Sequence, residues 1–141
     1  MNDRAASPKP RGTFVSGPLA TRDAALFTDL YELTMAASYL REGMTGLATF
    51  SLFARKLPKE RAFLVAAGLE DVLNYLRDFR VTRPAIRYLS SLGRFDADFL
   101  DFLGTLRFTG EVRAVPEGTV VFQDEPLLEV TAPIIEAQIV E

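Results

Sequence analysis

The sequence predicts an α+β fold in which helices pack on a mixed sheet. The first observation is a helix over 69–79, where apolar residues recur three, four, seven and ten positions after the first. The second is a change of period after residue 107, where apolar and polar residues begin to alternate as they do in strands. A hydrophobic fraction of 48% in 141 residues is enough for one domain with a real core.

The composition narrows the class of protein. The net charge is −3, and no apolar run is long enough to cross a bilayer or to form a secretory signal. The lack of cysteine fits a reducing, cytoplasmic compartment, and the lack of histidine removes the usual general base near neutral pH. The basic residues are too localised for a nucleic-acid groove. We therefore expect neither nucleic acid nor a membrane as a partner.

The first predicted helix covers 29–42, and Gly43 is its stop signal. Thr28 or Asp29 can cap its first turn, and Glu32 completes a capping box with Asp29. One face of this helix is apolar and needs a partner surface, and its members are Leu30, Leu33, Ala37 and Leu40.

Tyr31 lies in the first turn beside this apolar stripe, where folding does not demand a tyrosine. Two interpretations are open. The side chain can be a rim tyrosine that packs its ring and solvates its hydroxyl, or its ring can stack on a ligand.

The segment 47–54 alternates with both faces fairly apolar, which predicts a strand covered on both sides. Four basic residues follow it between 55 and 61, against the single acid Glu60. Such a compact patch suits a small anion such as a phosphate, whereas a solvated loop between two elements is the alternative. Ligands tend to bind at this end of the strands in open α/β sheets. The segment 63–67 is compatible with a strand or a turn.

Two shorter helices follow the one over 69–79. Thr82 and Gly93 bound the first of them, and Asp96 and Gly104 bound the second. They look like structural spacers without chemistry of their own.

The alternation after residue 107, with strands at 119–123 and 127–130, predicts a β-meander. In the first turn of this meander, Glu117 is expected to be exposed and Gly118 to adopt a positive φ. An apolar helix then begins at Pro133, and because it has about eight residues it needs packing or continuation to be stable. At the other end, 1–25 is expected to be a flexible lead-in rich in proline and glycine.

Four blocks of this sequence together resemble the N-terminal part of a nicotinate phosphoribosyltransferase. They occur in the family's order at similar spacings, over 28–35, 50–58, 63–73 and 116–118. The resemblance implies the N-terminal α/β domain of a type II phosphoribosyltransferase at 26–132. It also implies that 133–141 starts the family's irregular α/β barrel, the rest of which is missing from this sequence.

The resemblance implies a reaction and its partners. Enzymes of this family join nicotinate to 5-phosphoribosyl 1-diphosphate (PRPP) in NAD biosynthesis, with ATP hydrolysis and Mg²⁺. They act as cytoplasmic dimers whose active site is shared between subunits. The family's phosphorylated histidine lies beyond residue 141, so we expect no catalytic residue and no metal ligand in this chain. We also expect this chain alone to bind neither ATP nor Mg²⁺.

Four residues match positions of the family's substrate site. Tyr31 would stack on the nicotinate ring in the partner's site. Arg55 and Lys56 would lie near the phosphates of PRPP or of the product. Asp29 would cap its helix, orient a neighbour or contact the substrate.

A second hypothesis comes from a different class of function. The chain can be a catalytically inert interaction module that keeps the fold and docks through the apolar segment 133–140. A third hypothesis is a relative that acts on quinolinate or nicotinamide, because the residues that would distinguish these rings are not in this sequence.

Overall fold

The computed structural model describes residues 24–141. The lead-in predicted for 1–25 therefore lies outside the described residues, except for its last two. These two belong to the short 3₁₀ helix η1 (Ala24–Leu26), in which Ala25 is buried.

The described chain consists of short helices and strands. The order is α1 (Leu30–Arg41), β1 (Leu47–Phe53), β2 (Leu64–Val65), α2 (Leu69–Arg77), α3 (Arg83–Ser91), α4 (Ala97–Thr105), β3 (Glu111–Ala114), β4 (Val120–Val121), β5 (Pro126–Pro133) and α5 (Ile134–Val140). The predicted α+β class is confirmed. The helix starts follow their capping signals, because the side chain of Thr82 accepts the N–H of Ala85 at 3.4 Å and that of Asp96 accepts the N–H of Phe99 at 2.9 Å.

The strands form two separate sheets, so the predicted meander is wrong. One sheet has the order β1-β5-β3, and the other pairs β2 with β4. The carbonyl of Thr119 accepts the N–H of Ala66 at 2.8 Å, and the N–H of Gly118 donates to the carbonyl of Ala66 at 2.9 Å. These bonds draw β4 out to β2 and leave β3 and β5 as neighbours. All the pairings among residues 24–141 are antiparallel, in place of the mixed sheet that we expected.

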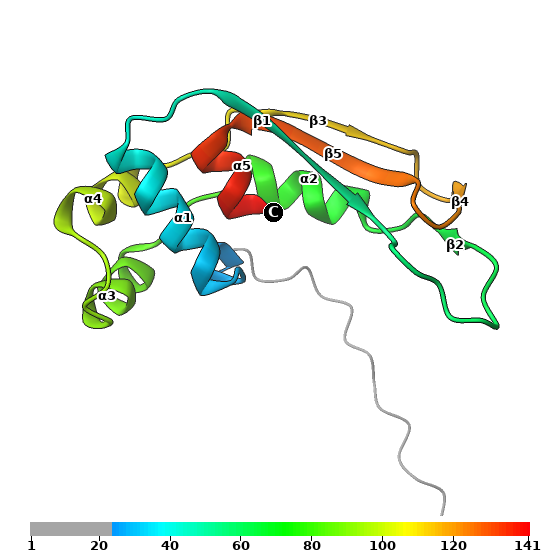
Figure 1. Cartoon of the computed structure of the whole chain (residues 1–141), viewed down its shortest axis with the longest axis horizontal. Coiled ribbons are helices and arrows are strands. Elements are labelled where there is room, and N and C mark those ends of the chain that lie inside the picture. Colours follow the sequence, from blue (N-terminus) through cyan, green and yellow to red (C-terminus); the bar gives the residue numbers. More distant parts are fainter. Residues whose placement is uncertain (1–23) are drawn as a thin grey trace, which may run out of the picture.

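The helices lie on one face of the β1-β5-β3 sheet (Figure 1). On that face, Ala48 and Phe50 of β1 pack into the core. On the other face Leu47 is 75% exposed, and the hydroxyls of Thr49 and Thr131 lie 2.8 Å apart in a polar cross-strand pair. The prediction that this strand is covered on both sides is therefore wrong within residues 24–141.

Helix α5 packs between α1 and the sheet (Figure 1). Its Ile135 and Ile139 join the helical core around Phe99 and Leu103, and its Ala137 joins the core beneath the sheet. This packing stabilises a helix that would be marginal in isolation. It also removes the docking surface predicted for the interaction module, because the apolar side of 133–140 is buried.

The turn between β3 and β4 anchors the start of α2. Gly118 has a φ of +80°, as predicted. Glu117 is exposed, as predicted, but its carboxylate also accepts the N–H groups of Gly68 and Leu69, both at 2.7 Å. These N–H groups belong to the N-terminus of α2, where a negative charge is favourable. The anion-binding capacity of this helix end is thus already used by the protein itself.

Candidate functional site

The first turn of α1 carries the tyrosine that the sequence singles out. Asp29 has the extended backbone of an N-cap, with φ −77° and ψ 147°, and forms a capping box with Glu32. The N–H of Asp29 donates to the Glu32 carboxylate at 3.3 Å, and the hydroxyl of Thr28 donates to the same carboxylate. Asp29 therefore occupies the cap position that the sequence predicts, at the helix start that presents Tyr31.

Tyr31 is 54% exposed and lies within an apolar surface. Phe27, Leu30 and Met35 are also exposed around the start of α1, and we call these four residues the α1 apolar surface. The predicted stripe is only partly correct, because the helix buries Leu33 while Leu30 faces out. The pKa of Tyr31 is raised by partial desolvation and by the negative charge of Glu32. The phenol therefore stays neutral near pH 7 and offers a flat ring and an O–H.

Glu32 is a residue that the sequence interpretation treated only as part of a cap. Its side chain is 7% exposed. Burial raises the pKa of its carboxyl, the hydrogen bond from the Asp29 backbone opposes this rise, and the nearby charge of Glu141 adds to it. Within residues 24–141 no basic side chain forms an ion pair with Glu32. Its position three residues after the N-cap was the signal available in the sequence.

Polar contacts join α1 to α5 and extend to Glu141, whose charge acts on Glu32. The hydroxyl of Tyr39 donates to Oε1 of Gln138 at 3.4 Å, and Nε2 of Gln138 donates to Glu141 at 3.1 Å. Burial, together with the charge of Glu32, raises the pKa of Tyr75 to about 12. Acidic and neutral polar groups of α1, α2 and the end of the chain therefore act on one another in this part of the fold.

The raised pKa of Glu32 predicts a specific pH dependence of stability. A carboxyl with a higher pKa in the folded state stabilises the fold when protonated, and this contribution is lost as pH rises through the folded pKa. Relative to Glu32→Gln, the wild-type chain should therefore gain stability as the pH falls from 7 towards the ordinary carboxyl value of 4.5. Urea unfolding of both proteins across this range measures the difference.

The matched control for this measurement is Glu60→Gln, in an exposed loop. This variant makes the same chemical change at an exposed position, so it shows what the substitution itself does to stability. A difference between Glu32→Gln and wild type that does not vary with pH would show that the buried carboxyl does not titrate as we expect.

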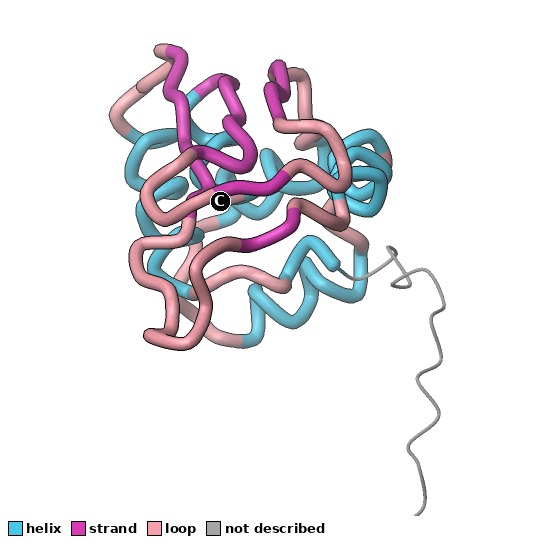
Figure 2. Tube along the Cα trace, turned by 90° about the vertical axis from the view of Figure 1, so that its right-hand side faces the viewer, coloured by secondary structure: helices cyan, strands magenta, loops and turns pink. Residues whose placement is uncertain are grey.

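Strand β1 ends at Phe53, and Ala54 comes next. Arg55 and Lys56 follow directly, and we call these two residues the basic pair. Both side chains are exposed, and neither forms an ion pair within residues 24–141. The loop that carries them leads from the far end of β1 to β2, away from the start of α1 (Figure 1). This end of the molecule, which faces the viewer in Figure 2, consists largely of loops and short strands. The structure does not bring the basic pair into contact with Tyr31.

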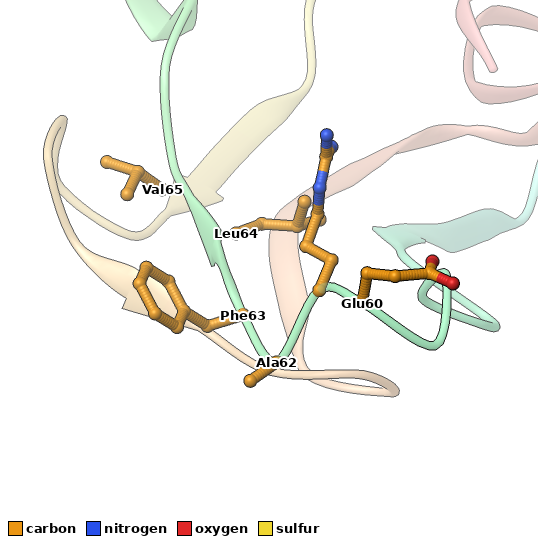
Figure 3. A pocket seen from close by; sticks show the side chains of 6 residues that line it. Glu60, Ala62, Phe63, Leu64 and Val65 are labelled. Atoms are coloured by element: carbon orange, nitrogen blue, oxygen red, sulfur yellow. The ribbon is translucent and has the colours of Figure 1, made fainter.

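An open hollow of about 500 Å³ lies farther along the same loop, lined by Glu60, Arg61, Ala62, Phe63, Leu64 and Val65. Figure 3 shows Phe63 and Val65 on one side of the chain and Leu64 on the other. The basic pair is not part of this lining. A smaller pocket of about 90 Å³ beside the start of α2 is mostly apolar and has Glu117 at its edge. Neither hollow unites the predicted site residues.

Residues 24–141 contain no group of three or more acidic, histidine or cysteine side chains placed to hold a metal ion. The donor set that Mg²⁺ prefers, several carboxylate or carbonyl oxygens around one point, does not converge in this part of the chain. We therefore derive no chemical step through Mg²⁺ from these residues.

The comparison with known families concerns nearly the whole described chain. Residues 26–141 match the model of the nicotinate phosphoribosyltransferase (NAPRTase) N-terminal domain. The chain belongs to the nicotinate phosphoribosyltransferase family. The helix start that bears Tyr31 and the loop that bears the basic pair both lie within the matched residues.

Similar proteins come from distant organisms. Nicotinate phosphoribosyltransferase pncB2 of Mycobacterium tuberculosis is 55% identical over 117 residues, which cover 83% of this chain and 25% of that protein. The nicotinate phosphoribosyltransferase of Bacillus subtilis is 42% identical over 118 residues, which cover 83% of this chain and 24% of that protein. The crystal structure of human nicotinic acid phosphoribosyltransferase matches with a TM-score of 0.70 and 40% identity, over 79% of this chain and 23% of that one.

The chain thus spans about a quarter of the length of the family members that it matches. All three are named for nicotinate or nicotinic acid, and none for quinolinate or nicotinamide. Among residues 24–141, no helix has the length and apolar character to cross a membrane.

Proposed function

We propose that this chain forms the N-terminal part of a nicotinate phosphoribosyltransferase, which makes nicotinate mononucleotide and diphosphate from nicotinate and PRPP in NAD biosynthesis. Membership of the family over residues 26–141 supports the reaction class. The observation that carries the proposal within the structure is Tyr31, which a capped helix start presents in an exposed apolar surface.

In this proposal Tyr31 stacks on the pyridine ring of nicotinate. An electron-poor ring gains about 1 kcal/mol from such stacking beyond the burial of its area. The N-terminus of α1 adds a positive partial charge near the same place, although Glu32 and the capping box already use part of it. Asp29 acts on the substrate only indirectly, by holding the helix start.

The exposure of the α1 apolar surface supports a site completed by another subunit. Phe27, Leu30, Tyr31 and Met35 are each more than one third exposed, and an apolar surface of this kind gains free energy when it is covered. We infer that the active form is a cytoplasmic homodimer in which this surface faces the partner's site.

The basic pair would contact the phosphates of PRPP or of the product. The guanidinium of Arg55 can form two parallel hydrogen bonds to a phosphate, and Lys56 supplies a compact charge. The ATP and Mg²⁺ of the reaction would be held by parts of the enzyme other than residues 24–141.

The decisive experiment uses a chimera in which residues 24–141 replace the matching segment of the Bacillus subtilis relative. We expect the chimera to form nicotinate mononucleotide and the 141-residue chain alone to show no binding of nicotinate by calorimetry. In the chimera, Tyr31→Ala should weaken nicotinate binding by about 1–3 kcal/mol, on the scale of base stacking on aromatic side chains. Tyr31→Phe should retain most of the affinity, because it keeps the ring.

Tyr88→Ala is the matched control, because Tyr88 is similarly exposed, at 58%, but lies on α3. Its affinity for nicotinate should equal that of the unmodified chimera. If Tyr31→Ala binds nicotinate as tightly as Tyr88→Ala does, Tyr31 is not a ring contact. If the 141-residue chain alone converts nicotinate to its mononucleotide, the proposal that catalysis needs other parts of the enzyme is wrong.

A further inference from the structure

The loop that carries the basic pair is held at two backbone points by a single turn. This turn covers 122–125 and joins β4 to β5, so we call it the β4–β5 turn. The N–H of Asp124 donates to the carbonyl of Ala54 at 2.9 Å. The N–H of Leu57 donates to Oε1 of Gln123 at 3.4 Å. Ala54 and Leu57 directly flank the basic pair, so the turn fixes the chain on both sides of it.

The conformation of the turn is unusual and well supported. Asp124 has a φ of +64° and is the one residue other than glycine with a positive φ in the described part of the chain. This left-handed backbone is unfavourable for most side chains, but aspartate and asparagine tolerate it. Nε2 of Gln123 donates to the Asp124 carboxylate at 3.2 Å, and the N–H of Phe122 donates to the Glu125 carboxylate at 2.8 Å. Contacts within the turn therefore orient Gln123 and Asp124, the two residues that form hydrogen bonds to the loop.

The β4–β5 turn forms hydrogen bonds to the backbone of the loop but no ion pair with the basic pair. It carries two acids, Asp124 and Glu125, but neither lies within 4.0 Å of a charged nitrogen of the basic pair. The ion pairs found in residues 24–141 are elsewhere, between Arg77 and Asp78 and between Arg113 and Glu111. The backbone of the loop is therefore anchored, while both cations are exposed and unpaired among the described residues and so accessible to an anion.

From this geometry we infer that the β4–β5 turn positions the phosphate contact, with Asp124 and Gln123 as positioning residues. The inference rests on the proposed function, in which the basic pair binds the phosphates of the phosphoribosyl donor. The planar guanidinium forms two parallel hydrogen bonds only in a narrow range of orientations. A loop free to move by about 1 Å would lose much of this contact, and such misplacement can cost about 100-fold in rate.

The first test measures backbone order in the 141-residue chain by ¹⁵N relaxation. In the wild type, the amides of Arg55 and Lys56 should have order parameters near 0.85, as in rigid backbone. Asp124→Val should lower both below about 0.6, because a β-branched residue opposes the left-handed backbone. Gln123→Ala, a milder change, should lower the value at Lys56 in particular. Asp124→Asn should keep the wild-type order parameters, because asparagine tolerates the left-handed backbone. Unchanged order in both Asp124→Val and Gln123→Ala would overturn the inference.

The second test measures steady-state kinetics in the chimera with the Bacillus subtilis relative. Asp124→Val should raise the KM for the phosphoribosyl donor about 10-fold to 100-fold and leave the KM for nicotinate within about twofold. Asp124→Asn should leave the KM for the phosphoribosyl donor at the value of the unmodified chimera. A general loss of structure would instead raise both KM values or lower kcat alone, and either result would count against positioning.

Variants of the basic pair separate this inference from the proposed function. If Arg55→Ala and Lys56→Ala leave the donor KM unchanged, the proposed phosphate contact is wrong, whatever the turn does. If they raise the donor KM while Asp124→Val and Gln123→Ala do not, the contact stands and the positioning role of the turn is wrong.

Discussion

Gly110→Ala should lower the free energy of unfolding by about 3 kcal/mol, at the upper end of the range for overpacking. A Cβ at this position would lie 2.5 Å from the carbonyl oxygen of Thr131 and 2.5 Å from Cβ of Ala132, both in β5. These atoms belong to the central strand of the sheet and cannot swing aside as the end of a long side chain can. The sheet would have to open between Gly110 and β5, which weakens the attachment of β3. Urea or thermal unfolding of the 141-residue chain measures the loss.

Gly104→Ala provides a matched control, because it adds the same methyl group to a glycine of α4. Its Cβ would meet Cδ1 of Ile86 at 3.4 Å, an ordinary contact. We expect the stability to stay unchanged or to rise by up to about 1 kcal/mol, since alanine is the better helix former. Equal stability of the two variants would show that the backbone near Gly110 adapts to a side chain.

Ile139→Ala should lower the free energy of unfolding by about 2–5 kcal/mol, the range for large-to-small changes in a packed core. Ile139 is 1% exposed and lies in the helical core with Leu33, Phe99 and Leu103. The change removes buried methyl groups and leaves a cavity between α5 and α1 that closely packed neighbours cannot fill. Denaturant unfolding with linear extrapolation gives the value.

The result for Ile139 also bears on the predicted division of the chain at residue 133. If α5 belongs to the same folding unit as α1, the variant should lower the single cooperative transition of the whole chain. Leu47→Ala, which truncates a side chain that is 75% exposed, should change stability by no more than about 0.5 kcal/mol. A loss of stability for Ile139→Ala as small as that for Leu47→Ala would mean that α5 is not part of the core in solution.

The helices were the most predictable part of the fold. The starts of α1, α3 and α4 follow the cap residues Asp29, Thr82 and Asp96, and α2 appears where the apolar period is clearest. Each of these signals lies within a few residues of the element that it specifies. The positive φ of Gly118 was predictable for the same reason, because a proline-containing turn requires it locally.

The pairing of strands and the burial of side chains were not predictable in this way. Val120 pairs with Val65, although the sequence interpretation placed it in a meander with its neighbours along the chain. The outer face of β1 looked as apolar as the inner face, but Leu47 is exposed because no described element lies over it. Glu32 has the sequence position of half a capping box, but it is buried in a fold where α5 packs against α1, and that packing is not encoded locally.

The same distinction between local sequence signals and tertiary contacts applies to the candidate site. The sequence alone determined that Tyr31 lies on a capped helix start and that a basic pair follows a strand, because both depend on residue types at short spacings. It also determined the family of the chain, which depends on the order of four blocks along the chain. Only the tertiary structure decided that Tyr31 and the basic pair lie in different parts of the domain, that Glu117 already occupies the start of α2 and that the β4–β5 turn holds the basic loop. The last two features depend on contacts between residues far apart in the sequence, such as Glu117 with Gly68, 49 positions away, and Gln123 with Leu57, 66 positions away. Such contacts form only when the whole chain has collapsed around a common core, and no local pattern of side chains encodes them.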